Sequence, residues 1–373
     1  MKKILSSIFL QKCPFLFWAA LFFFGLFYGS PGAWARQVTD VLGLNHEVPD
    51  QVERIVALGS SMMFITFLGA QDLVVGVEQI EKTLTSKPFI LVNHQRFKDL
   101  PIVGSGGSSR LINYEEIIKL KPQVVFLTAI SVSDTLMVQK KLGIPVIALS
   151  YTGKNMNFDP SVLIESLNLA GTILGFEDRA AELASYLLQI PQRLSYDPGP
   201  GKRAVAYLGG LSMRGNRDIL STTSQSFTME LAHIDNIMAR ESSLGQSFIN
   251  REHLLTLNPE IIFVDSNTLP LLKESVQKEP SYYQRLKAFT EGRAFLTLPH
   301  TSYHSNPETQ YTNAFLMAKA AYPEAYQDLD LAQVIDEIFT VLDGVPLLHF
   351  YQEHFSGYGR LTLKGDGLVL EER

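Results

Sequence analysis

A short pattern of residues occurs twice in the chain, as NYEEIIKLKPQVVFLT over 113–128 and as NREHLLTLNPEIIFVD over 250–265. Each copy has Asn, then Glu two positions later, then an apolar pair, Leu, Pro and an apolar run. Asn is a preferred N-cap and Glu is favourable in the first turn of a helix, so each copy predicts a short helix. Pro ends that helix, and the apolar run predicts a strand covered on both faces in a parallel sheet. The chain therefore contains one α/β unit twice, and we predict two similar lobes.

The rest of the chain fits two lobes of parallel-sheet β/α units. Apolar runs and helical stretches alternate from Arg54 onward, and the same alternation restarts near Arg203. Between them, apolar residues recur at helical spacing, which predicts one long rigid helix that Gly175 interrupts. The predicted organisation is a signal peptide over 1–35, an N-terminal α/β lobe over 36–158, a connecting helix over 159–196, a C-terminal α/β lobe with closing helices over 197–342, and a tail with a hairpin over 343–373.

Residues 1–35 have the pattern of a secretory signal peptide. Lys2 and Lys3 precede a long apolar segment, and the small residues Ala33 and Ala35 provide a cleavage site. We therefore expect a periplasmic protein whose mature chain begins at Arg36. An uncleaved membrane anchor is the alternative, because the apolar run is near the short end of a spanning helix. Cys13 precedes the apolar segment, so no lipid anchor is expected.

Removal of this segment changes what the composition allows. It takes away three lysines and no acidic residue, so the formal net charge changes from −6 to −9. An acidic protein argues against a nucleic-acid partner. The segment also holds the only cysteine and both tryptophans, Trp18 and Trp34. The mature chain is therefore expected to have no disulfide, no thiolate nucleophile and no cysteine-ligated zinc.

The order of these segments resembles a known family. RIVALGSSMMFITFLGAQDLVVGV, the first copy of the repeat, the helical stretch after Pro160 and the second copy stand in the order found in periplasmic substrate-binding proteins of ABC importers for ferric siderophores, haem and vitamin B12. The resemblance covers Gln51 to Leu342. It implies two α/β lobes joined by one rigid helix, a ligand held in the cleft between them, and delivery to an inner-membrane permease with its ATPase. It also implies a monomer without catalytic activity and without a resident cofactor.

The resemblance gives the repeat a role at the membrane. In the family, one acidic residue on the outer surface of each lobe fits a basic pocket of the permease, and the matching residues are Glu115 and Glu252. The alternative is that both glutamates only favour their helix N-termini. Family members often carry another Glu on the first helix, where this chain has Met63 or Phe64. His233 stands where the family's similar stretch has glycine, and its role stays open.

The ligand candidates come from loops that follow predicted strands, because open α/β sheets bind ligands at the carboxyl ends of their strands. Glycine and serine are frequent in two of these loops, where backbone N–H groups could approach an anion or a chelate. Their serines are Ser60, Ser61, Ser105 and Ser108. The alternative for each loop is an ordinary flexible turn, since neither matches a complete phosphate-binding motif.

Charged and aromatic candidates follow other strands. Arg214 and Arg217 could pair with carboxylates of an iron chelate, with surface solvation as the alternative. Tyr303 lies between His300 and His304, and two histidines four apart could hold a metal only on a helix, which Asn306-Pro307 argues against. Tyr207 and Tyr311 could stack on a flat ligand, although tyrosines are more often in the core or at the rim.

The sequence constrains the identity of the ligand less than the fold or the family. We expect an iron chelate of the ferric siderophore type, which would carry its own metal. A corrinoid or haem, a molybdate-type oxyanion, and a ligand sensor without transport are the alternatives. An enzyme finds little support, because the chain has no G-x-S-x-G or H-E-x-x-H motif.

Overall fold

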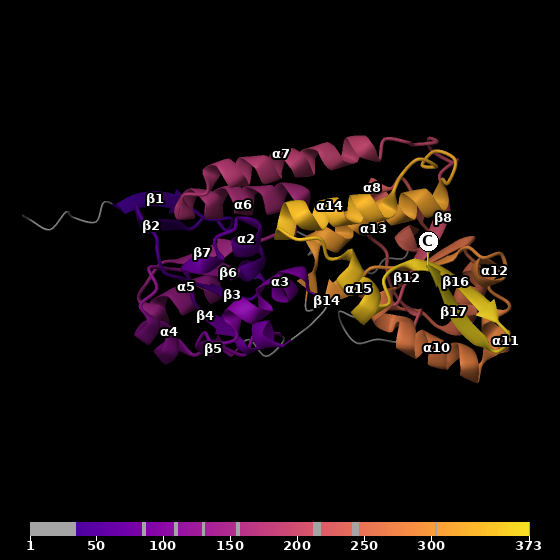
Figure 1. Cartoon of the computed structure of the whole chain (residues 1–373), viewed down its shortest axis with the longest axis horizontal. Helices are drawn as coiled ribbons and strands as arrows, with labels where there is room; N and C mark the ends of the chain where they lie inside the picture. Colours follow the sequence, from indigo (N-terminus) through magenta and orange to yellow (C-terminus); the bar gives the residue numbers. More distant parts are fainter. Residues whose placement is uncertain are drawn as a thin grey trace, which may run out of the picture.

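The computed structural model describes residues 35–83, 87–107, 111–128, 131–153, 157–211, 218–240, 246–302 and 304–372. The predicted signal peptide lies outside these residues except for Ala35. Ser108, Arg214, Arg217 and Tyr303 also lie outside them. The molecule has the predicted α/β architecture of two lobes, with the N-terminal lobe on the left of Figure 1 and the C-terminal lobe on the right.

The N-terminal lobe is built on a five-stranded sheet in the order β5-β4-β3-β6-β7, in which all neighbours are parallel. Its strands are β3 (Ile55–Leu58), β4 (Val74–Glu78), β5 (Ile102–Gly104), β6 (Val124–Thr128) and β7 (Val146–Leu149). Its helices are α2 (Ser61–Phe67), α3 (Pro88–Phe97), α4 (Tyr114–Leu120) and α5 (Val132–Leu142), with short 3-10 turns η1 (Gln71–Leu73) and η2 (Gln79–Lys82). Strands β3, β6 and β7 are largely buried, as expected for a sheet covered on both faces.

An N-terminal hairpin of β1 (Ala35–Thr39) and β2 (Asn45–Pro49) is attached to this lobe. The buried Asp40 carboxylate accepts hydrogen bonds from the backbone N–H of Ala148 at 3.1 Å and from the His46 ring at 2.9 Å. Burial raises the pKa of Asp40, but the hydrogen bonds from His46 and the backbone outweigh it, so the pKa lies below its ordinary value. The hairpin is thereby held against strand β7.

The C-terminal lobe contains an eight-stranded sheet in the order β11-β9-β8-β12-β13-β16-β17, with β10 also beside β8. Only β10, β8, β12 and β13 pair in parallel. The strands are β8 (Val205–Gly209), β9 (Ser221–Thr223), β10 (Asp235–Asn236), β11 (Gln246–Phe248), β12 (Ile261–Asp265), β13 (Ala294–Thr297), β16 (Gly359–Lys364) and β17 (Gly367–Glu372), and β14 (Thr301–Ser302) pairs separately with β15 (His304–Ser305). The hairpin β16–β17 comes from the C-terminal tail and extends this sheet antiparallel to β13.

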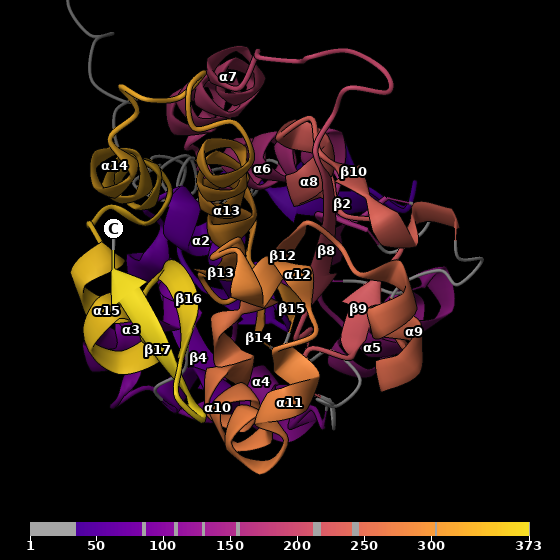
Figure 2. The ribbon, with the colours of Figure 1, turned by 90° about the vertical axis from the view of Figure 1, so that its right-hand side faces the viewer.

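The helices of this lobe lie around that sheet. They are α8 (Phe227–Leu231), η4 (Ile237–Arg240), α9 (Arg251–Leu257), η5 (Ser266–Thr268), α10 (Leu269–Lys278), α11 (Pro280–Tyr283), α12 (Lys287–Thr290), α13 (Pro307–Ala321), α14 (Leu331–Asp343) and α15 (Leu348–Phe355). Figure 2 looks from the C-terminal lobe and shows α13 and α14 above the sheet. His233 follows α8 with a φ of 54°, in the left-handed region that favours glycine, which explains why a glycine would suit this position.

The two copies of the repeat form the same local structure. The side chains of Asn113 and Asn250 accept hydrogen bonds from backbone N–H groups three residues later, at 3.2 Å and 2.8 Å, and so cap α4 and α9. Each helix ends in a left-handed residue, Lys121 or Asn258, directly before the proline. Strands β6 and β12 follow, each in the interior of its sheet.

The segment between the lobes consists of two helices, α6 (Pro160–Leu174) and α7 (Glu177–Arg193). Gly175 has a φ of 78° and forms the left-handed cap that ends α6. The two helices pack against each other, and α7 runs along the top of both lobes in Figure 1. The single connecting helix predicted over 159–196 is therefore corrected to a helical pair, because the positive φ of Gly175 reverses the chain.

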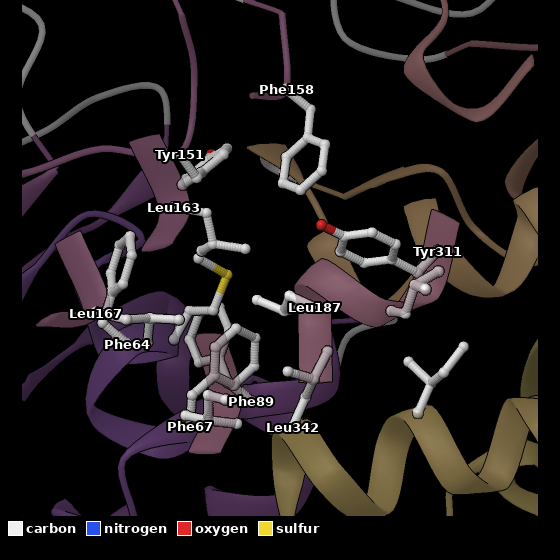
Figure 3. Close-up of a cluster of buried hydrophobic side chains, with 14 of the residues drawn as sticks. Phe64, Phe67, Phe89, Tyr151, Phe158, Leu163, Leu167, Leu187, Tyr311 and Leu342 are labelled. Carbon is white, nitrogen blue, oxygen red and sulfur yellow. The ribbon is translucent and has the colours of Figure 1, made fainter. Parts of the chain in front are cut away.

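One hydrophobic core runs from lobe to lobe beneath these helices. It joins Phe64 of α2 and Phe89 of α3 to Leu187 of α7, Tyr311 of α13 and Leu342 of α14, as Figure 3 shows. Helix α14 also packs against α2 and α3, although it belongs to the C-terminal part of the chain. Because separation of the lobes would expose part of this shared core, it restrains their relative motion.

Candidate functional site

The loop after β3 is held by a buried glutamate that the sequence analysis missed. Gly59 has a φ of 65°, and its N–H donates to Glu78 Oε2 at 2.9 Å. Glu78 and Glu81 also cap each other across η2, since the side chain of each accepts from the backbone N–H of the other. This arrangement fixes the carboxyl ends of β3 and β4 relative to each other.

The serines of this loop have different surroundings. Ser61 is buried, and its hydroxyl donates to the carbonyl of Leu58 at 2.8 Å and lies 3.1 Å from the hydroxyl of Thr128. Ser61 is therefore used to close the loop. Ser60 is also fully buried, but its Oγ has no hydrogen-bond partner among the described residues. A buried hydroxyl without a partner is costly, and Ser60 is therefore the better ligand candidate of the two.

Ser105, in the loop after β5, is occupied within its own lobe. Its hydroxyl donates to the carbonyl of Gly106 and accepts from the N–H of Leu111, both at 3.1 Å. These bonds close the base of the segment that contains Ser108, which lies outside the described residues. The structure thus gives Ser105 a role in shaping the loop.

Tyr207 is in the core of the C-terminal lobe, and this corrects its place among the ligand candidates. It is fully buried in β8, and its hydroxyl donates to the carbonyl of Ile219 at 2.6 Å. Burial raises the pKa of this phenol far above its ordinary value. Both the ring and the hydroxyl are therefore committed to contacts inside the lobe.

His300 follows β13 and is buried. Its backbone N–H donates to Asp265 Oδ2 at 2.8 Å, while its ring Nδ1 has no hydrogen-bond partner among the described residues. Burial lowers the pKa of His300 to about 4, so the ring is neutral at neutral pH. His304 lies in β15 rather than on a helix, so the two histidines lack the helical spacing of a metal pair.

A set of buried polar residues lies between the lobes, and sequence reasoning did not find it. We call Glu81, Lys87, Asn306, Glu308 and Asp343 the junction network. Lys87 lies directly before α3 in the N-terminal lobe, and its ammonium donates to Asn306 Oδ1 at 3.2 Å across the lobes. All five side chains are at least nine-tenths buried. The only hint in the sequence is Asn306-Pro307-Glu308, a helix start that places an acid in the first turn of α13.

Burial controls the charges of this network. Burial lowers the pKa of Lys87 to about 8, opposed by the nearby carboxylates of Glu308 and Glu81. Burial raises the pKa of Glu308 to about 7, with Lys87 opposing the shift. The pKa values of Glu81 and Asp343 are also raised by burial. Neither carboxylate oxygen of Glu308 has a hydrogen-bond partner among the other described residues, and the same holds for Asp343.

Aromatic rings fill another part of the junction. Phe158 precedes α6, and its ring centroid lies 5.7 Å from that of Tyr311 on α13 and 4.8 Å from that of Phe227 on α8. Figure 3 shows the Tyr311 hydroxyl pointing toward Phe158. This hydroxyl is buried without a hydrogen-bond partner in the described part of the chain. Tyr311 therefore packs at the junction itself, unlike Tyr207.

Glu115 and Glu252, the predicted docking residues, lie at the surface, unlike the buried groups described above. Both are exposed in the first turns of the equivalent helices α4 and α9. Glu252 also lines a surface pocket of about 490 Å³ together with Arg251, Leu255 and Arg285. Neither glutamate is buried with the junction network, so their side chains are available at the surface.

No group of three or more His, Cys, Asp or Glu side chains among the described residues is arranged to hold a metal ion. No helix within the same residues is long and apolar enough to cross a membrane.

Comparisons with known proteins agree with this architecture. The chain is 23% identical over 328 residues to the molybdate-binding protein MolA of Haemophilus influenzae, covering 82% of this chain and 90% of that protein. The structure of MolA bound to molybdate has a TM-score of 0.67 at 22% identity, covering 83% of this chain and 98% of the other. A TroA-like periplasmic binding protein, FepB from Veillonella parvula, has a TM-score of 0.62 at 20% identity, covering 90% and 99%.

The family assignment rests on the sequence as well as on the fold. The sequence pattern of the periplasmic binding protein family matches residues 55–300, from the first strand of the N-terminal sheet to His300. This family consists of binding proteins rather than enzymes, and its members act with an ABC transporter as the solute-binding component. The chain therefore belongs to the periplasmic binding protein family and is the solute-binding component of an ABC importer.

Proposed function

We propose that this protein binds a small oxyanion such as molybdate at the junction between its lobes. The observation that carries the proposal is that both lobes bury neutral polar atoms that have no hydrogen-bond partner among the described residues: Ser60 Oγ in the N-terminal lobe, and His300 Nδ1, Asn306 Nδ2 and Tyr311 OH in the C-terminal lobe. A buried polar group without a hydrogen bond costs about 1 to 3 kcal/mol. An oxyanion presents several acceptor oxygens, and it would satisfy these groups as donors.

The contacts between the lobes favour a small ligand. Lys87 and Asn306 are joined across the lobes at 3.2 Å, and the side chains of Asn157 and Gln225 are also hydrogen-bonded across them. The Phe158 and Tyr311 rings pack edge to face nearby. Residues 36–373 contain no tryptophan, which would be the largest surface for stacking a flat ligand. The similarity to the molybdate-binding MolA supports the same choice.

Charge at the junction also suits an anion at neutral pH. Lys87 supplies a positive charge, and protonation of Glu308 near pH 7 removes a negative one. A protonated Glu308 would also be a hydrogen-bond donor. The protein can therefore bind an anion in this region although its overall charge is negative.

A ferric chelate is the second candidate, because Arg214 and Arg217 suit carboxylates and Tyr303 suits an aromatic or phenolate contact. A similar fold is found in an ABC-type Fe3+-hydroxamate transport protein from Saccharomonospora viridis, with a TM-score of 0.51, and in the haem-binding HutB of Vibrio cholerae, with a TM-score of 0.54. Both proteins are 19% identical to this chain, so the similarity is one of fold.

Calorimetric titration of the purified protein with molybdate, a ferric hydroxamate, haem and cobalamin separates these candidates. We expect molybdate to bind with micromolar or tighter affinity, and the double variant Ser60→Ala, Asn306→Leu to weaken it at least about tenfold. Ser195→Ala, at an exposed serine, is the matched control. Tight binding of the hydroxamate without any response to molybdate would refute the oxyanion assignment.

Delivery to the permease is proposed to use Glu115 and Glu252. Their exposure at equivalent points of the two lobes matches a partner with two equivalent binding sites. Charge reversal of either glutamate to lysine should leave ligand affinity intact and reduce uptake by cells. A weaker ligand affinity in Glu115→Lys or Glu252→Lys would show that these residues serve the ligand site instead.

Export through a cleaved signal peptide is part of the same proposal. Cleavage after Ala35 would leave Arg36 at the N-terminus, where its guanidinium donates to the carbonyl of Ile173 on α6 at 2.7 Å. N-terminal sequencing of the exported protein should read Arg36 first. Recovery of the uncut chain in the inner membrane would instead show that the segment is an uncleaved membrane anchor.

A further inference from the structure

Strand β7 is at one edge of the N-terminal sheet, so no strand of the described residues pairs with its outer side. Two of its backbone N–H groups donate to side chains instead. The N–H of Val146 donates to Gln139 Oε1 of α5, and the N–H of Ala148 donates to Asp40 Oδ2 of the β1–β2 turn, both at 3.1 Å. An uncovered edge strand is a surface on which another extended chain can pair. These two side chains therefore close part of an edge that the sheet leaves open.

His46 joins the two side chains that cover this edge. It comes from β2 of the N-terminal hairpin and is only 4% exposed. Its ring Nε2 lies 2.9 Å from Asp40 Oδ2, and its ring Nδ1 lies 3.1 Å from Gln139 Oε1. These are the same two oxygens that accept from the N–H groups of β7. We call Asp40, His46 and Gln139 the edge cover.

The geometry requires the ring of His46 to donate from both of its nitrogens. Asp40 is ionised, because its carboxylate accepts from three backbone N–H groups. The N–H of Val146 fixes the Gln139 amide with its oxygen toward the ring. A neutral imidazole has one donor and one acceptor nitrogen, whereas an imidazolium has two donors. Because each nitrogen faces an acceptor oxygen, only the imidazolium makes both hydrogen bonds.

The charge of this ring is set by its partner in the edge cover. Among the described residues, Asp40 is the charged group that a hydrogen bond or ion pair joins to His46. Helix α5 contributes an uncharged amide, and its Lys140 and Lys141 are exposed. Strand β7 contributes backbone N–H groups, and Glu47 is exposed on the face of β2 opposite to His46. Loss of the ring proton would leave one nitrogen facing an oxygen without a hydrogen bond between them.

We propose that doubly protonated His46 clamps the N-terminal hairpin over the free edge of the N-terminal sheet, and that the clamp loosens when the ring loses a proton. The hairpin keeps two other anchors, since Val48 is buried in the shared core and Arg36 donates to the carbonyl of Ile173. The edge can therefore open while the lobe stays folded. A rise in pH removes the ring proton, and a fall in pH through the lowered pKa of Asp40, where its hydrogen bonds outweigh burial, removes the carboxylate. This inference depends neither on the ligand nor on the permease.

Nitrogen NMR of protein labelled in its histidine rings tests the charge. The signals of His46 are those that disappear in His46→Leu, and at pH 7 both of its ring nitrogens should carry a hydrogen. Gln139→Glu keeps both acceptors and adds a second negative charge, so its His46 ring should stay doubly protonated to a higher pH. This variant also gives the assignment if His46→Leu does not fold. A His46 ring nitrogen without a hydrogen at pH 7 would overturn the proposal.

Amide hydrogen exchange tests the clamp. In His46→Leu, the two N–H groups of β7 that the edge cover binds should exchange at least about tenfold faster than in the natural protein at the same pH. The N–H of Ser150 donates to Ser166 Oγ of α6 at 2.9 Å and serves as the internal reference, because the edge cover does not bind it. His349→Leu, at an exposed histidine of α15, is the matched control and should change no rate at this edge.

The dependence on pH separates a clamp from an ordinary structural contact. In the natural protein, exchange of the two covered N–H groups relative to that of Ser150 should rise at least about tenfold from pH 7 to pH 9. In Gln139→Glu the rise should move to higher pH. A relative rate that stays constant with pH, or an equal acceleration at Ser150 in His46→Leu, would show that His46 does not gate this edge.

Discussion

The two copies of the repeat form the same helix and strand but end in different chemistry. Strand β6 ends at Thr128 and strand β12 ends at the equivalent Asp265. Thr128 contacts the hydroxyl of Ser61 at 3.1 Å, whereas Asp265 accepts from the backbone N–H groups of Asn267 and His300. Each residue fixes the loop that follows a neighbouring strand, one by a hydroxyl contact and the other by a buried carboxylate. The local sequence pattern therefore specifies the helix and the strand, while the neighbouring strands and loops determine what the last residue of the strand contacts.

The helices of the two copies differ in the same way. Tyr114 in α4 has the ammonium of Lys141 4.7 Å from its ring centre, and the equivalent Arg251 in α9 lies 5.1 Å from the ring of Tyr282. The aromatic and cationic partners have exchanged places between the lobes. Contacts of this type at the surface contribute about 0.5 to 1 kcal/mol. Each lobe therefore has a cation–aromatic contact at this position of the helix, although the residue type at the position differs between the lobes.

The lobes also contribute unequally to their junction. The N-terminal lobe supplies Glu81 and the cation Lys87, and the C-terminal lobe supplies Asn306 and two further carboxyl groups, those of Glu308 and Asp343. The C-terminal sheet is extended by antiparallel strands that the N-terminal sheet lacks among its described residues. The lobes are therefore equivalent in the repeat and unequal at the junction.

Removal of the junction cation should have the largest effect on stability. Lys87→Met leaves Glu81 and Glu308 buried without the ammonium, and we expect a loss of about 3 to 5 kcal/mol in the free energy of unfolding at pH 8. The loss should be smaller at pH 5, because both carboxyl groups can then stay protonated. Urea unfolding followed by circular dichroism measures it, with the exposed Lys140→Met as the control. A loss below about 1 kcal/mol at pH 8 would mean that Lys87 does not hold the junction.

Glu308→Gln should change how stability depends on pH. The pKa of Glu308 is raised from its ordinary 4.5 to about 7, so between these values the folded protein holds a proton that the unfolded chain has released. Stability from this group is therefore lost as the pH rises through that window. Relative to the natural protein, the free energy of unfolding of Glu308→Gln should therefore increase by on the order of 2 kcal/mol as the pH rises from 5 to 8.

The lowered pKa of His300 acts in the opposite direction, since stability from this group is lost as the pH falls from 6.5 toward 4. It is present in both proteins, so it cancels in the difference. A difference between Glu308→Gln and the natural protein that stays constant from pH 5 to pH 8 would contradict the raised pKa of Glu308.

The strand ends should differ in a paired comparison. Asp265→Asn removes a carboxylate that accepts from two backbone N–H groups, and we expect a loss of about 2 kcal/mol. Thr128→Val removes one hydroxyl contact, and we expect about 1 kcal/mol or less, because Ser61 keeps its bond to Leu58. Both are measured by urea unfolding. Equal losses would mean that Thr128 and Asp265 contribute equally to the stability of their lobes.

The caps should give the smallest effects, equal in the two lobes. Asn113→Ala and Asn250→Ala each remove one side-chain bond to a helix N–H, at a cost of about 1 kcal/mol. Asn168→Ala, at an exposed position inside α6, should cause no loss, since alanine favours a helix interior. Midpoints of urea unfolding report these changes, and a clear difference between the two cap variants would break the equivalence of the repeat.

The sequence by itself determined the local elements and the family. Caps, prolines and apolar runs predict the helix and strand of both copies of the repeat, and Gly175 predicts a break in the helical segment between the lobes. These predictions are possible because the signals act between residues that are close in the chain. Their order was sufficient for the resemblance to periplasmic binding proteins, which the comparisons support. The same local signals did not show that α6 and α7 would lie side by side, since the direction of the chain after Gly175 depends on packing.

Only the tertiary structure decided which polar residues become buried together. The sequence predicts Tyr207 as a ligand contact, but its hydroxyl donates to the carbonyl of Ile219 in the core. Lys87 and Glu308 are more than two hundred residues apart, and neither position carries a local signal of burial. Their shifted pKa values arise because the two lobes together exclude water from them. Desolvation is a property of the assembled fold, and for that reason the pattern of the chain could predict the lobes but not the chemistry where they meet.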